Sequence, residues 1–206
     1  MVDQRRLLVG VTGASGSVYA EKLIEHALEH FSRVYVCFTS AGAKVAQYEM
    51  AKSNRDASPL LSALANGKCP DQYREKLRLL DEDDLFAPVA SGTSAPTDMV
   101  VVPCSMGTLA RITHGMSSNL LERAADVVIK ERKRMILVPR ETPFSVIHLK
   151  NMLQLAELGV QILPPSPGFY NHPQSLDDIV DFVVGKIFDA LSIDHSLTER
   201  WNHRRI

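Results

Sequence analysis

Short apolar runs alternate along this chain with segments in which apolar side chains recur every three or four positions. A continuous apolar run is typical of a strand buried on both faces, and the longer spacing indicates a helix. The expected strands are Arg6–Val11, Val34–Thr39, Asp98–Cys104, Arg134–Val138 and Val160–Leu163. The expected helices are Ser17–His30, Ala41–Met50, Ser145–Leu158 and Ser175–Leu191, with a further apolar stripe inside Ser117–Arg134.

This alternation predicts an α/β fold: a single domain with a Rossmann-like or flavodoxin-like parallel sheet sandwiched by helices. The chain has 206 residues, of which 45% are hydrophobic, and this suffices for one well-buried core. We expect the domain to span residues 1–191, and residues 192–206 to form a C-terminal tail at a subunit contact. The least regular part is Ser53–Pro96, in which we assign no strand.

Composition narrows the classes of function. The formal net charge of -1 gives no general attraction to nucleic acid. The three cysteines form no CxxC pair and the seven histidines show no HxH or HExxH spacing, so no metal site is predicted. No apolar stretch approaches the roughly 20 residues of a membrane span, and the apolar start of the chain runs directly into a helix, unlike a signal peptide. We therefore expect a cytoplasmic protein.

The turn "TGASG" (Thr12–Gly16) follows the first strand, at the edge of the sheet where α/β proteins bind ligands. Its glycines permit close approach of a ligand, and the helix that follows offers N–H groups to an anion. A dinucleotide site requires G-x-G-x-x-G and an acidic residue after the second strand. Here Gly10, Gly13 and Gly16 are three apart, and the second strand ends in "FTS" (Phe38–Ser40). These features favour a single phosphate over NAD, with an unliganded tight turn as the alternative.

Two more clusters follow strand ends and would face the same crevice. Ser105, Gly107 and Thr108 come directly after the third strand, with Ser105 at the N-cap position of a helix. Arg140 and Glu141 follow the fourth strand between two prolines, which favours a functional pair over a surface ion pair.

Basic and aromatic side chains elsewhere add candidates. Arg123 and Lys130 are two helical turns apart and share a face. The proline-rich loop Leu163–Ser175 has Phe169 and Tyr170 at its tip. Since this loop follows a strand end, we expect Tyr170 to reach a ligand or a neighbouring subunit.

Six segments together resemble the flavin prenyltransferases of the UbiX type, within the flavin-dependent cysteine-decarboxylase-like superfamily. The segments are "TGASG", "ASGTSAP", "VVPCSMGTLA", "NLLERAADVVIKER", "VPRETPFSVIHLKNML" and "ILPPSPGFYNHPQS", in the family's order and over most of Leu7–Leu191. The resemblance implies that a dimethylallyl group from dimethylallyl monophosphate is joined to N5 and C6 of reduced FMN, without a metal ion. FMN is then a substrate, and the prenylated FMN would serve a UbiD-type decarboxylase, often in ubiquinone biosynthesis.

The resemblance also implies roles for individual residues. Glu141 would protonate the departing phosphate beside Lys130, and Ser15 and Glu49 would relay protons at the flavin, which makes these four the catalytic set. The implied flavin contacts are Gly13, Ala14, Ser15, Thr39, Ser105, Met106, Gly107, Thr108 and Arg140. The implied contacts of the prenyl phosphate are Arg123, Lys130, Glu141, Tyr170 and Lys186.

The chain departs from the family pattern at two places. Lys186 stands where many members have an arginine, which keeps the charge but loses the bidentate fork. Leu85 stands where some relatives carry a tryptophan near the prenyl chain. Family members assemble as dodecamers with sites shared between subunits, so the Tyr170 loop and the tail near Arg200–Trp201 are expected contact surfaces.

Three other functions are compatible with a fold of this class. An FMN-dependent decarboxylase of the cysteine type would have a "PASANT"-like loop and a catalytic histidine, whereas this chain has "PCSMGT" and no histidine from Phe31 to Thr113. A non-catalytic flavin-binding subunit would not need the acid and base groups of the implied catalytic set. A short-chain reductase would need a Tyr-x-x-x-Lys pair, which is missing.

Overall fold

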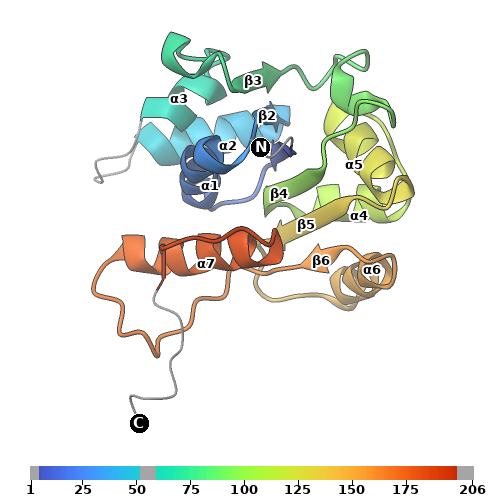
Figure 1. Ribbon diagram of the computed structural model, residues 1–206. Helices are drawn as coiled ribbons and strands as arrows, with labels where there is room; N and C mark the ends of the chain where they lie inside the picture. The colour runs from blue at the N-terminus through green and yellow to red at the C-terminus, as the bar shows by residue number, and fades with distance from the viewer. Residues whose placement is uncertain (1–4, 52–58, 199–206) are drawn as a thin grey trace.

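Six parallel strands form one sheet in the order β3-β2-β1-β4-β5-β6 in the computed structural model, which describes residues 5–51 and 59–198 (Figure 1). Apolar side chains form most of each central strand, which explains why these segments pair in the middle of the sheet. The strands are β1 (Arg6–Val11), β2 (Arg33–Phe38), β3 (Leu77–Leu80), β4 (Asp98–Cys104), β5 (Arg134–Pro139) and β6 (Gln161–Ile162). The expected parallel α/β sheet is thus confirmed.

Helices cover both faces of the sheet. The helices are α1 (Ser17–His30), α2 (Ser40–Ala51), α3 (Pro59–Ala65), α4 (Met106–Thr113), α5 (Leu120–Lys130), α6 (Val146–Glu157) and α7 (Leu176–Ala190), with 3-10 turns η1 (Asp71–Tyr73) and η2 (Pro88–Ala90). One core packs α1, α2, α3 and α7 against the sheet, and the other packs α4, α5 and α6 against the opposite face (Figure 1). Side chains of β1 alternate between the two cores, as a strand requires: Leu7 and Val9 enter the first, and Leu8 enters the second.

The irregular region of the sequence contains a sixth strand that the hydrophobic pattern did not reveal. β3 pairs with β2 at the edge of the sheet, and only Leu77 of its four residues is fully buried. A half-exposed edge strand lacks the continuous apolar run by which the other strands were recognised. The same region also contributes α3 to the first core. Among the described residues, none of the helices is long and apolar enough to cross a membrane.

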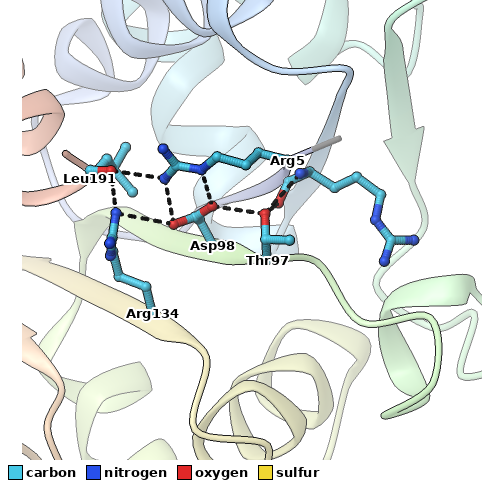
Figure 2. Close-up of polar contacts among 6 residues, drawn as sticks. Arg5, Thr97, Asp98, Arg134 and Leu191 are labelled. Atoms are coloured by element: carbon cyan, nitrogen blue, oxygen red, sulfur yellow. Dashed lines mark hydrogen bonds and ion pairs between the residues drawn. The ribbon is translucent and has the colours of Figure 1, made fainter. Parts of the chain in front are cut away.

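A partly buried ion-pair network closes the amino edge of the sheet and holds the end of α7 (Figure 2). Asp98, at the start of β4, accepts hydrogen bonds from Arg5 at 2.8 and 3.1 Å, and Arg134 lies 3.5 Å away. Both arginines also donate to the carbonyl of Leu191, directly after α7. The network therefore joins β4, β5 and α7 at the edge opposite the ligand side.

Residues 192–198 return along the body of the domain. Ile193 and Leu197 pack against the first core, and the side chain of His195 is 4% exposed. The predicted contact near Arg200–Trp201 lies outside the described residues.

Candidate functional site

Hydrogen bonds join the turns after β1 and β4 at the carboxyl edge of the sheet. The hydroxyl of Thr12 donates to the carbonyl of Pro103 at 2.8 Å and accepts from the N–H of Ser105 at 2.8 Å. Thr12 is buried, so these bonds fix the distance between the two turns. The sequence placed Thr12 in the first turn but gave it no role.

The start of α1 is capped by an acidic side chain from α2. The N-cap residue Gly16 has φ +115°, a conformation that favours glycine, and it has no side chain with which to cap the helix. The carboxylate of Glu49 accepts from the N–H of Gly16 at 3.1 Å and from that of Ser17 at 2.9 Å. The anion-binding position at this helix start is thus occupied by Glu49, which corrects the expectation that these N–H groups are open to a phosphate.

The same contacts determine the charge of Glu49. Burial acts to raise the pKa of its carboxyl, but hydrogen bonds from the Ser15 side chain and from the Ser17 and Gly16 N–H groups outweigh burial. The net result is a pKa below the ordinary value, because a carboxylate is the better acceptor. The structure therefore brings Glu49 next to Ser15, as the resemblance implied, and keeps Glu49 ionised at neutral pH.

The start of α4 is a second helix N-terminus on the same edge. Ser105 caps it: its hydroxyl accepts from the N–H of Thr108 at 3.3 Å and donates to the Thr108 hydroxyl at 3.0 Å. The N–H groups of Met106 and Gly107, at the first two helical positions, point out of the helix. Gly107 is exposed. This helix start therefore offers backbone donors and a positive dipole end to an anion.

The turn after β2 lies against the first turn. Thr39 is 8% exposed, and its hydroxyl accepts from the N–H of Gly42 at 3.0 Å. A Cβ on Gly42 would lie 2.2 Å from the carbonyl oxygen of Val11, and one on Gly13 would lie 2.7 Å from the Cβ of Ala41. The close approach of α2 to the first turn thus depends on these glycines.

Arg140 lies at the same carboxyl edge of the sheet, directly after β5. Its N–H donates to the carbonyl of Cys104, and its Nε donates to the carbonyl of Ser15 at 3.2 Å. The guanidinium is exposed between the first and second turns. Glu141 follows it, half-buried, with its carboxylate accepting from the N–H of Thr142 at 3.1 Å. The structure therefore brings together, at one edge, the flavin contacts that the resemblance implied, with Glu49 and Glu141 beside them.

Arg123 and Lys130 both lie on α5 and contact other parts of the chain than the turns described above. Arg123 donates to the carbonyl of Ala90 at 3.2 Å and pairs with Asp126 at 2.7 Å. Lys130, the last residue of α5, pairs with Glu131 beside Gly92, in the loop that leads into β4. Both side chains lie against the segment that includes Ala90 and Gly92, and Lys130 is near the amino edge, opposite to Arg140.

Tyr170 and Lys186 form a third group, on α7 and the loop before it. The ring of Tyr170 packs edge-on against the ring of Phe182, with centroids 6.0 Å apart. The Nζ atom of Lys186 lies over the Phe182 ring, 5.9 Å from its centroid. On the same helix, Asp181 pairs with Lys22 on α1, and Phe188 packs on His26 and His30 farther along α1. Lys186 is thus on the flank of the domain rather than at the carboxyl edge.

One further residue of the carboxyl edge was missed from the sequence. Glu82 follows β3 in the acidic run Asp81–Asp84. Its carboxylate accepts from the N–H of Ser40 at 2.7 Å and from the Ser40 hydroxyl, and its carbonyl accepts from the N–H of Leu120 at 2.7 Å. It therefore ties α2 to α5. Because the hydrophobic pattern did not reveal β3, it could not show that Glu82 follows the end of a strand.

The arrangement at the carboxyl edge suits an anionic, planar ligand. The open donors of α4 and the Arg140 guanidinium supply a phosphate site, and the exposed Gly13 and Ser15 leave room beside the ionised Glu49. Within the described part of the chain, no group of three or more His, Cys, Asp or Glu side chains is arranged to hold a metal ion. The residues present thus fit the phosphate and ring of a flavin.

Comparison with known proteins agrees with this geometry. The chain matches the Flavoprotein family over residues 1–188. The flavin prenyltransferase UbiX of Halalkalibacterium halodurans is 44% identical over 198 residues, which make up 96% of this chain and 93% of that protein.

Two solved structures are similar over nearly the whole chain. AnUbiX (PadA1), in complex with FMN and dimethylallyl pyrophosphate, has a TM-score of 0.82 and 36% identity and covers 97% of this chain and 98% of its own. A dodecameric FMN-dependent UbiX-like decarboxylase from Escherichia coli O157:H7 has a TM-score of 0.82 and 34% identity and covers 96% and 99%.

Proposed function

The chain belongs to the Flavoprotein family and, within it, to the UbiX-type flavin prenyltransferases, and from this membership we propose that it joins a dimethylallyl group from dimethylallyl monophosphate to N5 and C6 of reduced FMN. The single observation that carries the proposal is the carboxyl edge itself. There one chain combines an open helix start, an exposed arginine and an ionised carboxylate next to a serine hydroxyl.

The flavin is bound, in this proposal, by the turns described above. The N–H groups of Met106 and Gly107 and the guanidinium of Arg140 hold the phosphate. Gly13, Ala14 and Ser15 face the flavin ring. Thr39 and Thr108 line the pocket on the side of the protein core, since both are buried. Reduced FMN supplies the nucleophilic nitrogen.

Ser15 and Glu49 handle the protons at the flavin. The depressed pKa makes Glu49 a carboxylate, which accepts a proton rather than donates one at neutral pH. Glu49 therefore acts as the base when C6 gives up its hydrogen, and the Ser15 hydroxyl, hydrogen-bonded to the carboxylate, carries the proton between them.

Arg123, Lys130, Tyr170 and Lys186 bind the donor phosphate from neighbouring copies of the chain. The support is their position: Lys130 lies near the amino edge and Lys186 on the flank, whereas Glu141 lies at the carboxyl edge. Glu141 then protonates the departing phosphate across a subunit boundary, and the cations stabilise its charge.

A homo-oligomer, in the form of a dodecamer, provides these boundaries. The similar E. coli protein is dodecameric. Helix α6 also presents an apolar face to the outside, where four of its large apolar side chains are between 53% and 69% exposed. Exposed apolar faces of this kind mark contacts between proteins. The residues are Val146, Ile147, Leu149 and Leu153.

The product, prenylated FMN, passes to a UbiD-type decarboxylase, as the family resemblance implies, in ubiquinone biosynthesis or a related decarboxylation. We also propose a cytoplasmic location. Three free cysteines support it, because a reducing compartment keeps thiols in this state.

The test is incubation of the purified protein with FMN, a reductant, dimethylallyl monophosphate and a metal chelator, followed by mass spectrometry of the flavin. We expect a gain of one five-carbon unit. A flavin of unchanged mass would contradict the proposal, and carbon dioxide released from a cysteine-terminated peptide in a parallel reaction would assign the chain to the cysteine-type decarboxylases instead. Dimethylallyl diphosphate in a second reaction establishes which donor is preferred.

A further inference from the structure

Lys186 is held between two neighbours on its own helix. Its Nζ lies 3.4 Å from Oδ2 of Asp189, three residues along α7, and 5.9 Å from the ring centroid of Phe182, four residues back. The ammonium is about half exposed, with a side-chain exposure of 52%. The charged end thus contacts two neighbours and is otherwise open to solvent.

Asp189 is itself oriented by the segment after α7. Nε2 of His195 lies 3.3 Å from Oδ1 of Asp189, and the N–H of Leu197 donates to Nδ1 of His195 at 3.3 Å. Because Nδ1 accepts, Nε2 carries the hydrogen in the neutral ring and donates it to Asp189. Neutral His195 therefore satisfies both contacts.

The position of His195 is fixed by packing. Its ring lies over Phe188, with centroids 6.0 Å apart, and a Cβ on Gly185 would lie only 2.9 Å from its Cε1. The backbone after α7 is held in turn by Arg5 and Arg134, which donate to the carbonyl of Leu191 (Figure 2). A chain of contacts thus runs from the amino edge of the sheet to the ammonium of Lys186.

We propose that Asp189 is a positioning residue that orients the Lys186 ammonium toward the phosphate of the prenyl donor, with His195 holding Asp189 in place. The proposal rests on the proposed function, in which Lys186 binds that phosphate. The ligand class is a phosphate monoester dianion.

The need for such a residue follows from the chemistry of lysine. An arginine presents a rigid, planar fork that meets a phosphate with two hydrogen bonds, whereas a lysine carries one ammonium on a flexible stem and loses more rotamer freedom on binding. Asp189 takes one of the three N–H groups of the ammonium and leaves two for the phosphate. Phe182 supports the stem from the other side, and its ring also packs on Tyr170.

The test is a double-mutant cycle between Asp189→Asn and Lys186→Arg, with binding as the readout. Calorimetric titration of dimethylallyl monophosphate into the protein loaded with oxidised FMN measures Kd without turnover. In the Lys186 background we expect Asp189→Asn to raise Kd about threefold to tenfold. In the Lys186→Arg background we expect a change of less than about twofold, because the arginine fork orients itself.

Asp181→Asn is the matched control, since Asp181 is an aspartate on the same helix, paired with Lys22 at 3.0 Å. It is expected to leave the Kd of the phosphate ester unchanged. Kinetics add a second readout: Asp189→Asn raises the KM for the donor and leaves the affinity for FMN as it was.

An equal effect of Asp189→Asn in the two backgrounds would assign Asp189 a merely structural role and overturn the proposal. So would a Kd that does not change in the Lys186 background. A third outcome is that the variants show the expected changes in Kd but the wild-type protein does not prenylate FMN. This outcome would contradict the proposed function and leave the positioning role of Asp189 standing.

Discussion

The carboxylate of Glu49 accepts a hydrogen bond of 2.9 Å from the N–H of Ser17 and thereby takes the position at which many α/β proteins bind a phosphate. The helix dipole and the hydrogen bonds both favour the ionised form. In the proposed function, the phosphate of the ligand therefore binds at the second helix start, at α4. One carboxylate thus caps α1 and is also, in the proposed function, the base beside Ser15.

Glu49→Gln tests the catalytic part of this role. The amide oxygen still caps the helix, but the side chain no longer accepts a proton, so we expect kcat to fall about 100-fold, the lower end for loss of a general base. Fluorescence titration should show unchanged FMN affinity. Prenylated flavin formed by this variant at the wild-type rate would remove Glu49 from the mechanism.

The lowered pKa of Glu49 also predicts how stability depends on pH. For a carboxyl whose pKa is lower in the folded protein, the stabilisation is present above the unfolded-state pKa and is lost as the pH falls through the folded-state pKa. The ordinary value is 4.5, so the loss lies below that pH. Urea unfolding of wild type and Glu49→Gln should differ most at neutral pH and converge in acid. A difference that persists undiminished at pH values well below the ordinary one would contradict the prediction.

Sharing of the site between copies is tested by mixing two inactive variants. Arg140→Ala removes the flavin side and Lys130→Ala the donor side, so each homo-oligomer should be inactive. If one chain supplies Arg140 and its neighbour Lys130, co-expression restores about a quarter of the sites, as expected for random mixing in a symmetric assembly.

The control for this experiment pairs two variants on the same side. Arg140→Ala co-expressed with Glu49→Gln should recover no activity, because both residues belong to the carboxyl edge of one chain. Failure of the Arg140→Ala and Lys130→Ala mixture to recover, with hybrids verified by differential tagging, would mean that one chain supplies both residues.

Much of the fold was predictable because central strands and amphipathic helices can be recognised from the spacing of their apolar residues. β3 could not be recognised in this way, since an edge strand buries only part of its residues. The role of Glu82, which follows β3, was therefore missed as well. The position of Lys130 follows from topology rather than from motif: α5 runs back antiparallel to the strands, and its 11 residues end near the amino edge. Spacing alone placed Lys130 on a face with Arg123 but could not say at which edge.

The pairing of Glu49 with the first turn shows the same limit. The two lie on different elements, 33 residues apart, and no local pattern reports such a contact. Only the close packing of α2, permitted by Gly42, brings them together. The family resemblance named both residues without giving this physical reason.

Asp98→Asn tests the network at the amino edge. The carboxylate of Asp98 is 3% exposed and faces Arg5 and Arg134, so its removal leaves two partly buried guanidinium groups without a counter-charge. We expect the free energy of unfolding to fall by about 2 kcal/mol, less than for a fully buried pair because both arginines reach solvent. Urea denaturation measures this loss. Asp71→Asn, which breaks the exposed pair with Arg74, should cost less than about 0.5 kcal/mol. Since the network lies opposite to the ligand edge, FMN affinity of Asp98→Asn should remain near that of wild type under native conditions, and a large loss of affinity in a folded variant would show that the two edges are coupled.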